Sequence, residues 1–513
     1  MAVYDIARGT RDFLPQDMVV RNHVEYIIRN TFESYGFQQI QTPIFERFEL
    51  LAARSGEEIR ESMFTFVSDR EEYALRPELT APVCRVIASG KLSKLPVPYK
   101  LYYIGQCFRY CRPQAGRYRE FTQAGLELMG SKDPIADAEV IAIAVKTLKN
   151  LGIDQYKVKI GNIGIFRGIL EKEYSDDYDK QSRVINNIDH IMSVWEKCDA
   201  IKSHASFNQE DFDFIKVETE SLYRIQEDIG YSGEHEILPV SDLGGGKAGN
   251  NDQQLKEKAT DRLNMLSLAI ESTYRALWSK ENIVSEKVAA LLIDIARMRG
   301  KYEEIIPKAE KLLSGTPTLD ALEQLSQVSR FLLSFGVADF DIVLGVARGL
   351  DFYTDTVFEI DSPLLGAQKQ ICGGGRYDKL VEEFGGISIP ATGFAFGFDR
   401  IIETFIKTGK AVDLAPVSVF VANVDDSCKF RAVEVADSLR SSNFRASVDL
   451  LGLSLRDQLG YASKIGAEFA VIVGPDELKE DKCKLRQLET RFEEIVPLSA
   501  LVDKIKDIRK SGK

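Results

Sequence analysis

The sequence has little that would place it in a membrane, in an oxidising compartment or around a metal ion. No apolar run among its 513 residues approaches the roughly 20 residues that a membrane-spanning helix needs. The opening "MAVYDIARGTRDFLPQD" lacks the apolar core of a signal peptide and carries too many acids for a transit peptide. The seven cysteines form no CxxC pair, and Cys107 and Cys111 have no second pair at metal-ligand spacing. We therefore expect reduced structural thiols, no membrane contact and a cytoplasmic location.

Two common catalytic signatures are also missing. A phosphate loop at Gly244–Gly246 is a weak match, because no apolar strand leads into the glycines and Ala248 follows Lys247 where serine or threonine is needed. Histidine is scarce, and none of the four lies in a motif, so no acid–base histidine is proposed: His23, His190, His204 and His235.

The charge is unevenly distributed along the chain. The formal net charge is −12 and the sequence pI is about 5.2, which taken alone argues against nucleic acid. Residues 171–260, however, hold 20 acidic and 10 basic residues, whereas residues 421–513 hold 16 of each. The acidity is mainly a property of one segment, and an RNA-binding face elsewhere is compatible with it.

The hydrophobic pattern predicts a large first region, interrupted by a helical stretch, and a smaller domain after it. "MVVRNHVEYIIRNTFESYGF" has helical spacing, and the strand-like "PYKLYYIGQCFRY" and "REFTQAGLELMG" flank the basic turn "CRPQAGR". After about residue 416 the chain alternates strands with helices, as in a small α/β domain. We expect five parts: 1–164 (first part of the large region, which the resemblance described below implies is the catalytic domain), 165–335 (mainly helical insertion), 336–410 (second part of the same region), 411–416 (linker) and 417–513 (C-terminal domain).

Arginines and isolated acids gather in the strand-like segments. Arginine suits phosphate oxygens, because its planar fork stays charged when partly buried. A buried acid in a strand is costly unless it is paired, and it could bind a cationic small molecule. The same residues could instead pair with one another. Their combination with strand ends and glycine runs favours a site: Glu78, Arg109, Arg112, Arg117, Glu127, Arg348, Asp351 and Arg400.

These segments resemble a known family. "LYYIGQCFRYCRPQAGRYREFTQAGLELMG" resembles motif 2 of class II aminoacyl-tRNA synthetases in its histidyl form. "GLDFYTDTVFEI" and "CGGGRYDKLV" resemble the two histidine signatures of histidyl-tRNA synthetases, and "GFAFGFDRI" resembles motif 3. "SLRDQLGYASKIGAEFAVIVG" is similar to the anticodon-binding domain of that family. The likeness covers nearly the whole chain except roughly 165–335.

The resemblance implies a fold, a reaction and partners. The fold would be α+β, with a class II antiparallel catalytic sheet, a helical insertion and a C-terminal α/β anticodon-binding domain. The histidine carboxylate would attack the α-phosphorus of ATP, and the histidyl group would then pass to the 3′-terminal adenosine of histidine tRNA. Mg²⁺ would bridge the ATP phosphates without a dedicated protein site. The protein would be a homodimer built around the first helix and strand.

The resemblance also assigns roles to residues. Arg109 would hold the α-phosphate and the substrate carboxylate, and Arg348 would also bind the α-phosphate. Arg400 would grip the γ-phosphate, and Arg117 would fold over the triphosphate. The histidine-binding residues would be Glu78, Leu79, Thr80, Gln123, Glu127, Phe352, Tyr353 and Tyr377.

Within the histidine pocket, Glu127 and the Tyr353 hydroxyl would face the two imidazole nitrogens, which fixes the ring. Glu78, Thr80 and Gln123 would bind the α-amino group. Tyr377 and Gly373–Gly375 would form the wall, where a Cβ would collide with substrate. Asp351 would be a structural partner of a nearby arginine.

One position departs from the family pattern, and it keeps other readings open. Cys111 stands where class II motif 2 has a glutamate beside the adenine, and losing one charged hydrogen bond costs about 1.5–3 kcal/mol of binding energy. One alternative is a non-catalytic paralogue that regulates histidine biosynthesis, but such paralogues usually lack the anticodon-binding domain and erode "RGLDFY". Another is an RNA- or protein-binding module that has lost its chemistry.

Overall fold

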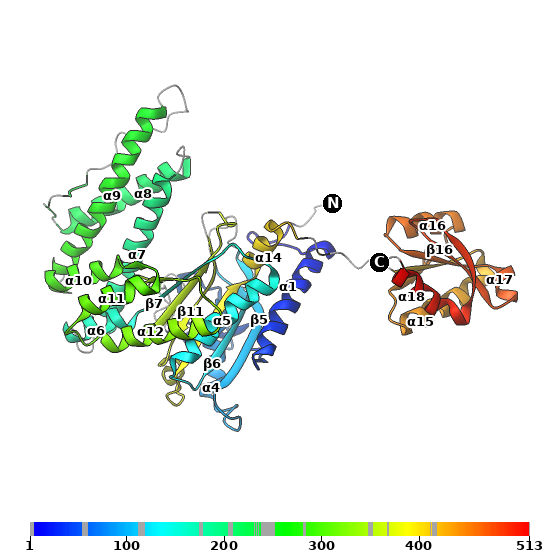
Figure 1. Ribbon diagram of the computed structural model, residues 1–513, viewed down its shortest axis with the longest axis horizontal. Coiled ribbons are helices and arrows are strands. Elements are labelled where there is room, and N and C mark those ends of the chain that lie inside the picture. The colour runs from blue at the N-terminus through cyan, green and yellow to red at the C-terminus, as the bar shows by residue number, and fades with distance from the viewer. Residues whose placement is uncertain are drawn as a thin grey trace. The chain divides into compact units, whose positions relative to one another are not determined.

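The computed structural model describes residues 5–53, 60–110, 118–173, 178–203, 209–229, 231, 233, 235–237, 252–280, 284–346, 352–366, 369–410, 412 and 418–511. Two compact units divide the chain, Met1–Ala411 and Val412–Lys513. Figure 1 shows a large sheet with its helices in the first unit and a small α/β unit at the C-terminal end.

A nine-stranded sheet forms the centre of the first unit. Its strands follow the order β1-β5-β6-β12-β11-β10-β7-β9-β8. Neighbours are antiparallel except for the pairs β1–β5 and β7–β9, so the predicted antiparallel sheet is confirmed. The strands are β1 (Gln38–Gln39), β5 (Tyr99–Phe108), β6 (Glu120–Met129), β7 (Lys157–Asn162), β8 (Arg299–Gly300), β9 (Asp341–Val343), β10 (Thr356–Asp361), β11 (Gln370–Arg376) and β12 (Ala391–Gly397).

Helix α5 (Pro134–Leu151) packs against this sheet and is buried along most of its length. Its start and end follow from the sequence, because Asp133 caps the N-terminus and Gly152 ends the helix in the left-handed conformation at φ 67°. Helices α1 (Pro15–Ser34) and α12 (Leu319–Ser334) pack on α5, and α14 (Phe398–Lys407) packs on β6, β12 and α1. The predicted first helix is therefore confirmed.

A second, three-stranded sheet precedes helix α4 in the chain. Its order is β2-β4-β3, with β2 (Phe45–Arg47), β3 (Thr65–Ser68) and β4 (Glu71–Leu75). The chain leaves β4 and enters α4 (Thr80–Ala88) within a few residues, which places Glu78 at the start of that helix. The short helices α2 (Phe48–Ala52) and α13 (Leu380–Glu383) pack on α4.

The middle of the chain is mainly helical, as the pattern predicts. Helices α8 and α9 lie side by side, and α7 packs on α9 (Figure 1). Helix α12 packs on α5, and β8 joins the large sheet, so the end of this stretch is part of the sheet unit. The limits at 165 and 335 stay a prediction. The helices are α6 (Gly164–Glu173), α7 (Tyr178–Lys202), α8 (Gln209–Ile229), α9 (Asp252–Lys280), α10 (Glu286–Ala296), α11 (Tyr302–Leu313) and α12.

The C-terminal unit is an α/β domain with a five-stranded sheet. Its order is β14-β13-β15-β16-β17, and the three predicted strands β13, β14 and β15 are parallel. The antiparallel hairpin of β16 and β17 extends the sheet and was not predicted from the sequence. The elements are β13 (Val419–Asn423), α15 (Lys429–Ser441), β14 (Ala446–Val448), α16 (Leu455–Lys464), β15 (Phe469–Val473), α17 (Pro475–Lys479), β16 (Lys482–Gln487), β17 (Glu493–Pro497) and α18 (Leu501–Ser511), with 3₁₀ turns at Asp426–Cys428 and Leu498–Ala500.

Candidate active site

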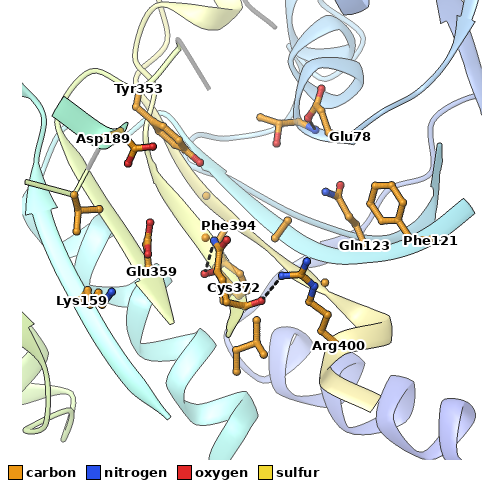
Figure 2. Close-up of a pocket in the computed structure, with 18 of the residues that line it drawn as sticks. Glu78, Phe121, Gln123, Lys159, Asp189, Tyr353, Glu359, Cys372, Phe394 and Arg400 are labelled. Atoms are coloured by element: carbon orange, nitrogen blue, oxygen red, sulfur yellow. Dashed lines mark hydrogen bonds between the residues drawn. The ribbon is translucent and has the colours of Figure 1, made fainter. Parts of the chain in front are cut away.

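A cavity of about 790 Å³ lies against the middle strands of the nine-stranded sheet. Strands β6, β10, β11 and β12 contribute side chains to it, and so do helices α4, α7 and α14. This volume is in the range typical of sites that bind small molecules or cofactors. Figure 2 shows charged, aromatic and amide side chains converging on it from different elements.

The carboxyl group of Glu127, on β6, is held by three hydroxyl groups. Thr80 Oγ1 donates to it at 2.8 Å, Tyr103 OH donates at 3.0 Å, and Tyr377 OH donates to the other oxygen. Burial of the side chain raises the pKa of Glu127 to about 8. A Cβ at Gly393 would overlap the carboxyl group, so this strand position requires glycine. The cavity therefore contains an acid that exchanges its proton near neutral pH.

A second buried acid, Glu78, marks the N-terminal end of α4. Its carboxyl group accepts hydrogen bonds from the backbone N–H groups of Thr80 and Ala81, the latter at 3.0 Å. Burial raises the pKa of Glu78, although both backbone hydrogen bonds and the charge of Arg109 oppose that rise. Glu78 and Gln123 both line the cavity and are seen on the same side of it in Figure 2. Together they offer acceptors to a cationic group.

Two arginines give the cavity positive charge. Arg109 Nε donates to the carbonyl of Pro77 at 3.0 Å, and its guanidinium lies 5.4 Å from the ring centroid of Phe121. Arg400 Nη1 donates to the carbonyl of Gln370 at 2.7 Å (Figure 2). Each bond fixes one edge of a guanidinium group. A guanidinium group held in this way is well suited to bind phosphate oxygens.

An aromatic group forms another part of the wall. The ring centroid of Phe352 lies 4.9 Å from that of Tyr353 and 5.5 Å from that of Tyr377. Figure 2 shows the Tyr353 side chain reaching into the cavity, across from Gln123. A planar ligand group would therefore meet aromatic faces on one side and polar ends on the other.

The glycines of the run Gly373–Gly375 are required for two different reasons. Gly373 lines the cavity, as expected for close approach of a substrate. A Cβ at Gly374 or Gly375 would instead meet backbone carbonyls of the adjacent strands, those of Gly393 and Thr356. The expectation that a Cβ anywhere in this run would strike substrate is corrected, because two of the three glycines are needed for strand packing.

The cavity brings together most of the residues predicted from the sequence. Leu79 is buried beside the cavity but does not line it. Arg117 and Arg348, together with Cys111, Arg112 and Asp351, lie outside the described residues. The predicted residues that line the cavity are Glu78, Thr80, Arg109, Gln123, Glu127, Phe352, Tyr353, Tyr377 and Arg400.

Helix α7 supplies a part of the wall that sequence analysis missed, through Asp189, Met192, Ser193 and Glu196. Lys159 on β7 connects this helix to the sheet, because its Nζ lies 3.0 Å from Glu196 Oε1 and 3.3 Å from Asp361 Oδ2. The alternation of two lysines with apolar residues in "YKVKIGN" was the available signal. The position of α7 over the sheet has no local signal in the sequence.

Asp399 is another missed residue of the cavity. Its carboxylate accepts from Arg11 and Arg21, both at 2.6 Å, and from the backbone N–H of Thr122 at 2.9 Å. This network joins α14, which carries Arg400, to α1 and β6. It therefore fixes the helix that presents Arg400.

Among the described residues, no group of three His, Cys, Asp or Glu side chains is arranged to hold a metal ion. Within the same part of the chain, no helix is long and apolar enough to span a bilayer.

Comparison with known families gives two matches. Residues 9–190 and 252–401 match the family described as "Histidyl-tRNA synthetase", and residues 418–508 match "Anticodon binding domain". The stretch 191–251, which includes most of the acidic segment, lies outside both.

Curated relatives match the chain over nearly its full length. The histidine–tRNA ligase of Methanococcus maripaludis (strain C6) is 35% identical, with 98% of this chain and 100% of the relative covered. The histidine–tRNA ligase of Methanocaldococcus jannaschii is 34% identical over the same shares of the two chains.

Solved structures show the same fold. The histidyl-tRNA synthetase of S. aureus has a TM-score of 0.63 and 25% identity, and covers 98% of this chain and 100% of its own. That of a Nostoc species has a TM-score of 0.67 and 22% identity, with 99% and 100% covered.

Proposed function

The chain belongs to the histidyl-tRNA synthetase family and is a histidine–tRNA ligase, and on this premise we propose how the residues of its cavity divide the reaction. Histidine and ATP would bind side by side over the middle strands. The histidine carboxylate would attack the α-phosphorus of ATP, and pyrophosphate would leave. The histidyl group would then pass from the adenylate to a ribose hydroxyl of the 3′-terminal adenosine of histidine tRNA, and AMP would leave.

Glu127 and Tyr353 would hold the imidazole ring. A neutral imidazole has one N–H donor and one acceptor nitrogen. The ring N–H would donate to the ionised Glu127 carboxylate, and the Tyr353 hydroxyl would donate to the other nitrogen. The three hydroxyl donors to Glu127 support this arrangement, because they orient its carboxyl group and leave it room for one more hydrogen bond.

The remaining groups of histidine would be held at the α4 side of the cavity. Glu78 and Gln123 would accept from the α-ammonium group, with the Thr80 hydroxyl beside them. Leu79 follows Glu78 and precedes Thr80 in the sequence, and its side chain is buried, so it would support this site by packing behind it. A buried carboxylate with two backbone donors stays fixed in place when the ammonium group arrives.

The arginines would stabilise the charge that develops during phosphoryl displacement. Arg109 and Arg348 would bind the α-phosphate, where negative charge accumulates, and Arg109 would also hold the attacking carboxylate. Arg400 would bind the γ-phosphate, and Arg117 would cover the triphosphate. The positions of Arg109 and Arg400 in one cavity support these roles.

Mg²⁺ would accompany ATP rather than occupy a site built by the protein. Mg²⁺ that accompanies a nucleotide is held mainly by phosphates and water with one or two carboxylates, so it does not need a protein cluster of three ligands. The ATP phosphates would be its ligands, and we assign no step to it.

The larger assembly is also part of the proposal. We propose a cytoplasmic homodimer built around the first helix and strand, and a division of the chain at the limits predicted from the sequence. The matched anticodon-binding domain would anchor histidine tRNA.

The single observation that carries the site proposal is the buried acid Glu127, held by three hydroxyls in the same cavity as Tyr353 and two arginines. The test is ATP–pyrophosphate exchange with two variants. Tyr353→Phe should raise the histidine KM about tenfold and leave the ATP KM unchanged, because it removes one hydrogen bond to the ring. Arg400→Gln should raise the ATP KM and leave the histidine KM unchanged. A variant pair that affects both KM values equally would contradict the assignment.

A further inference from the structure

The turn that carries Tyr353 packs on the start of α6, which contains none of the motifs quoted in the sequence analysis. Helix α6 follows β7 directly. The Asn162 side chain stabilises this junction, because its Oδ1 accepts from the backbone N–H of Gly164 at 2.8 Å and its Nδ2 donates to the carbonyl of Ala321 at 3.1 Å. The Asn162 side chain therefore ties the first turn of α6 to helix α12, through its bonds to Gly164 and Ala321.

Two hydrogen bonds join this junction to the Tyr353 turn. The backbone N–H of Ile163 donates to the carbonyl of Asp355 at 2.8 Å. One turn along the helix, Arg167 Nη2 donates to the carbonyl of Tyr353 itself at 3.1 Å. Arg167 is only 8% exposed, so it reaches the turn from inside the protein.

The opposite side of the same peptide is held by β11. The backbone N–H of Thr354 donates to the carbonyl of Arg376 at 2.8 Å. The Tyr353–Thr354 peptide group therefore donates to β11 and accepts from α6. A peptide group bonded at both ends cannot rotate without losing a bond, so the backbone from which the Tyr353 side chain projects is fixed.

The charge of Arg167 is also used locally. Asp355 is largely buried, and burial raises its pKa, while the positive charges of Arg376 and Arg167 oppose that rise. A buried guanidinium is favourable only when carbonyl or carboxylate oxygens satisfy it. Here Arg167 Nη2 donates to the Tyr353 carbonyl, and the positive charge of the guanidinium acts on Asp355 in the same turn.

We propose that Arg167 is a positioning residue for histidine recognition: by holding the Tyr353 carbonyl, it aims the Tyr353 hydroxyl at the imidazole-binding end of the cavity. Arg167 does not touch the substrate and acts through Tyr353. The inference rests on the proposed role of Tyr353 and extends it to the first helix after β7.

A double-mutant cycle tests this inference by ATP–pyrophosphate exchange. Arg167→Gln should raise the histidine KM about tenfold, as expected for loss of a charge-assisted hydrogen bond, and leave the ATP KM unchanged. Arg167→Lys keeps a donor and should recover part of the loss. In the Tyr353→Phe background, Arg167→Gln should add less than about twofold, because the hydroxyl that it aims is gone.

Ile169→Ala is the matched control for destabilisation. Ile169 is buried on the same helix, and its truncation lowers stability without removing the bond to Tyr353. This control should lower Tm and leave the histidine KM unchanged. Circular dichroism and Tm show whether each variant is folded, and Arg167→Lys serves if Arg167→Gln is not.

The outcomes separate the two ideas. If Tyr353→Phe raises the histidine KM but the Arg167 variants do not, the inference about Arg167 is overturned and the role of Tyr353 stands. If Arg167→Gln has the same effect with and without the Tyr353 hydroxyl, Arg167 supports the fold only, and the inference is overturned. If Tyr353→Phe leaves the histidine KM unchanged, the proposed role of Tyr353 is wrong and the inference fails with it.

Discussion

At the scale of single residues, the chemistry of the cavity depends on the surroundings of Glu127. An exposed glutamate would titrate near pH 4.3, whereas burial raises the pKa of this one to about 8. The hydroxyls of Thr80, Tyr103 and Tyr377 favour the ionised form but do not cancel the effect of burial. The acid is thus close to its titration point at neutral pH.

This titration predicts that histidine binding depends on pH. Accepting a bond from the imidazole N–H requires the ionised carboxylate, so the free site must first lose its proton. The histidine KM should therefore fall as the pH rises from about 7 towards 8 and level off above it, with a slope of up to about tenfold per pH unit. Exchange kinetics measured at several pH values would show this.

Glu127→Gln provides the control for that profile, because an amide does not titrate. The variant should have a weaker but pH-independent histidine KM over the same range. A wild-type profile that is equally flat would show that Glu127 keeps one protonation state.

Tyr103 gives a second residue-scale prediction, since it lies in the stretch that resembles motif 2 but the resemblance assigns it no role. Tyr103→Phe removes one donor to the Glu127 carboxylate, so the pKa of Glu127 should rise further, by about one unit. The pH at which the histidine KM levels off should move upwards by the same amount. The neighbouring Tyr102→Phe is the matched control, because the Tyr102 hydroxyl bonds Glu33 and Arg29 instead. Equal effects of the two substitutions would exclude a specific role for Tyr103.

At the scale of elements, the site depends on helices that the motifs do not contain. Helix α6 holds the Tyr353 turn, and α7 contributes to the cavity wall. The ion pair between Lys159 and Glu196 links α7 to β7. The Lys159 side chain is 18% exposed, so this pair is better shielded from solvent than an ordinary surface pair.

Glu196→Gln is therefore expected to destabilise the protein by about 1 kcal/mol, or about 2 °C in Tm, because Lys159 keeps a charge with one carboxylate partner fewer. The pair of Lys308 and Glu304, at 2.6 Å but 59% and 60% exposed, is the matched control. Glu304→Gln should change Tm by about 0.5 °C or less. Thermal melting of both variants measures the difference, and equal shifts would mean that Lys159 gains nothing from its shielded position.

At the scale of the whole molecule, the two units have different tasks. The first contains the cavity, and the second matches the anticodon-binding domain. RNA affinity depends heavily on lysine and arginine contacts. Residues 421–513 balance their charges, whereas residues 171–260 are strongly acidic, so the C-terminal unit is the better candidate for the tRNA anchor.

Removing residues 417–513 should therefore abolish charging of histidine tRNA and leave ATP–pyrophosphate exchange largely intact. The residues that we propose for adenylate formation all lie in the first unit. Aminoacylation and exchange assays on the truncated protein measure the two steps separately, and salt titration of tRNA binding measures the lost contacts. A truncated protein that charges tRNA as well as the full chain would refute this division.

Much of the fold could be predicted because its patterns are local. The β5–β6 hairpin, helix α1 and the alternating C-terminal unit all follow from hydrophobic periodicity and turn residues within short windows. The β16–β17 hairpin was missed because its strands are short and rich in lysine and glutamate, "KCKLRQ" and "EEIVP", so they lack a strong apolar signal.

The sequence by itself determined the family and the reaction, and it predicted nine of the residues that line the cavity, since the motifs keep these residues at fixed spacing. The tertiary structure alone decided their partners. Strand register pairs Tyr103 with Gly125 and Gly393 with Glu127, which brings hydroxyls from distant positions onto one carboxylate and raises its pKa through burial. Helix packing likewise brings Arg167 to Tyr353, 186 positions away. Burial and hydrogen bonding between distant segments depend on the packed arrangement of the whole chain, and no local pattern encodes them.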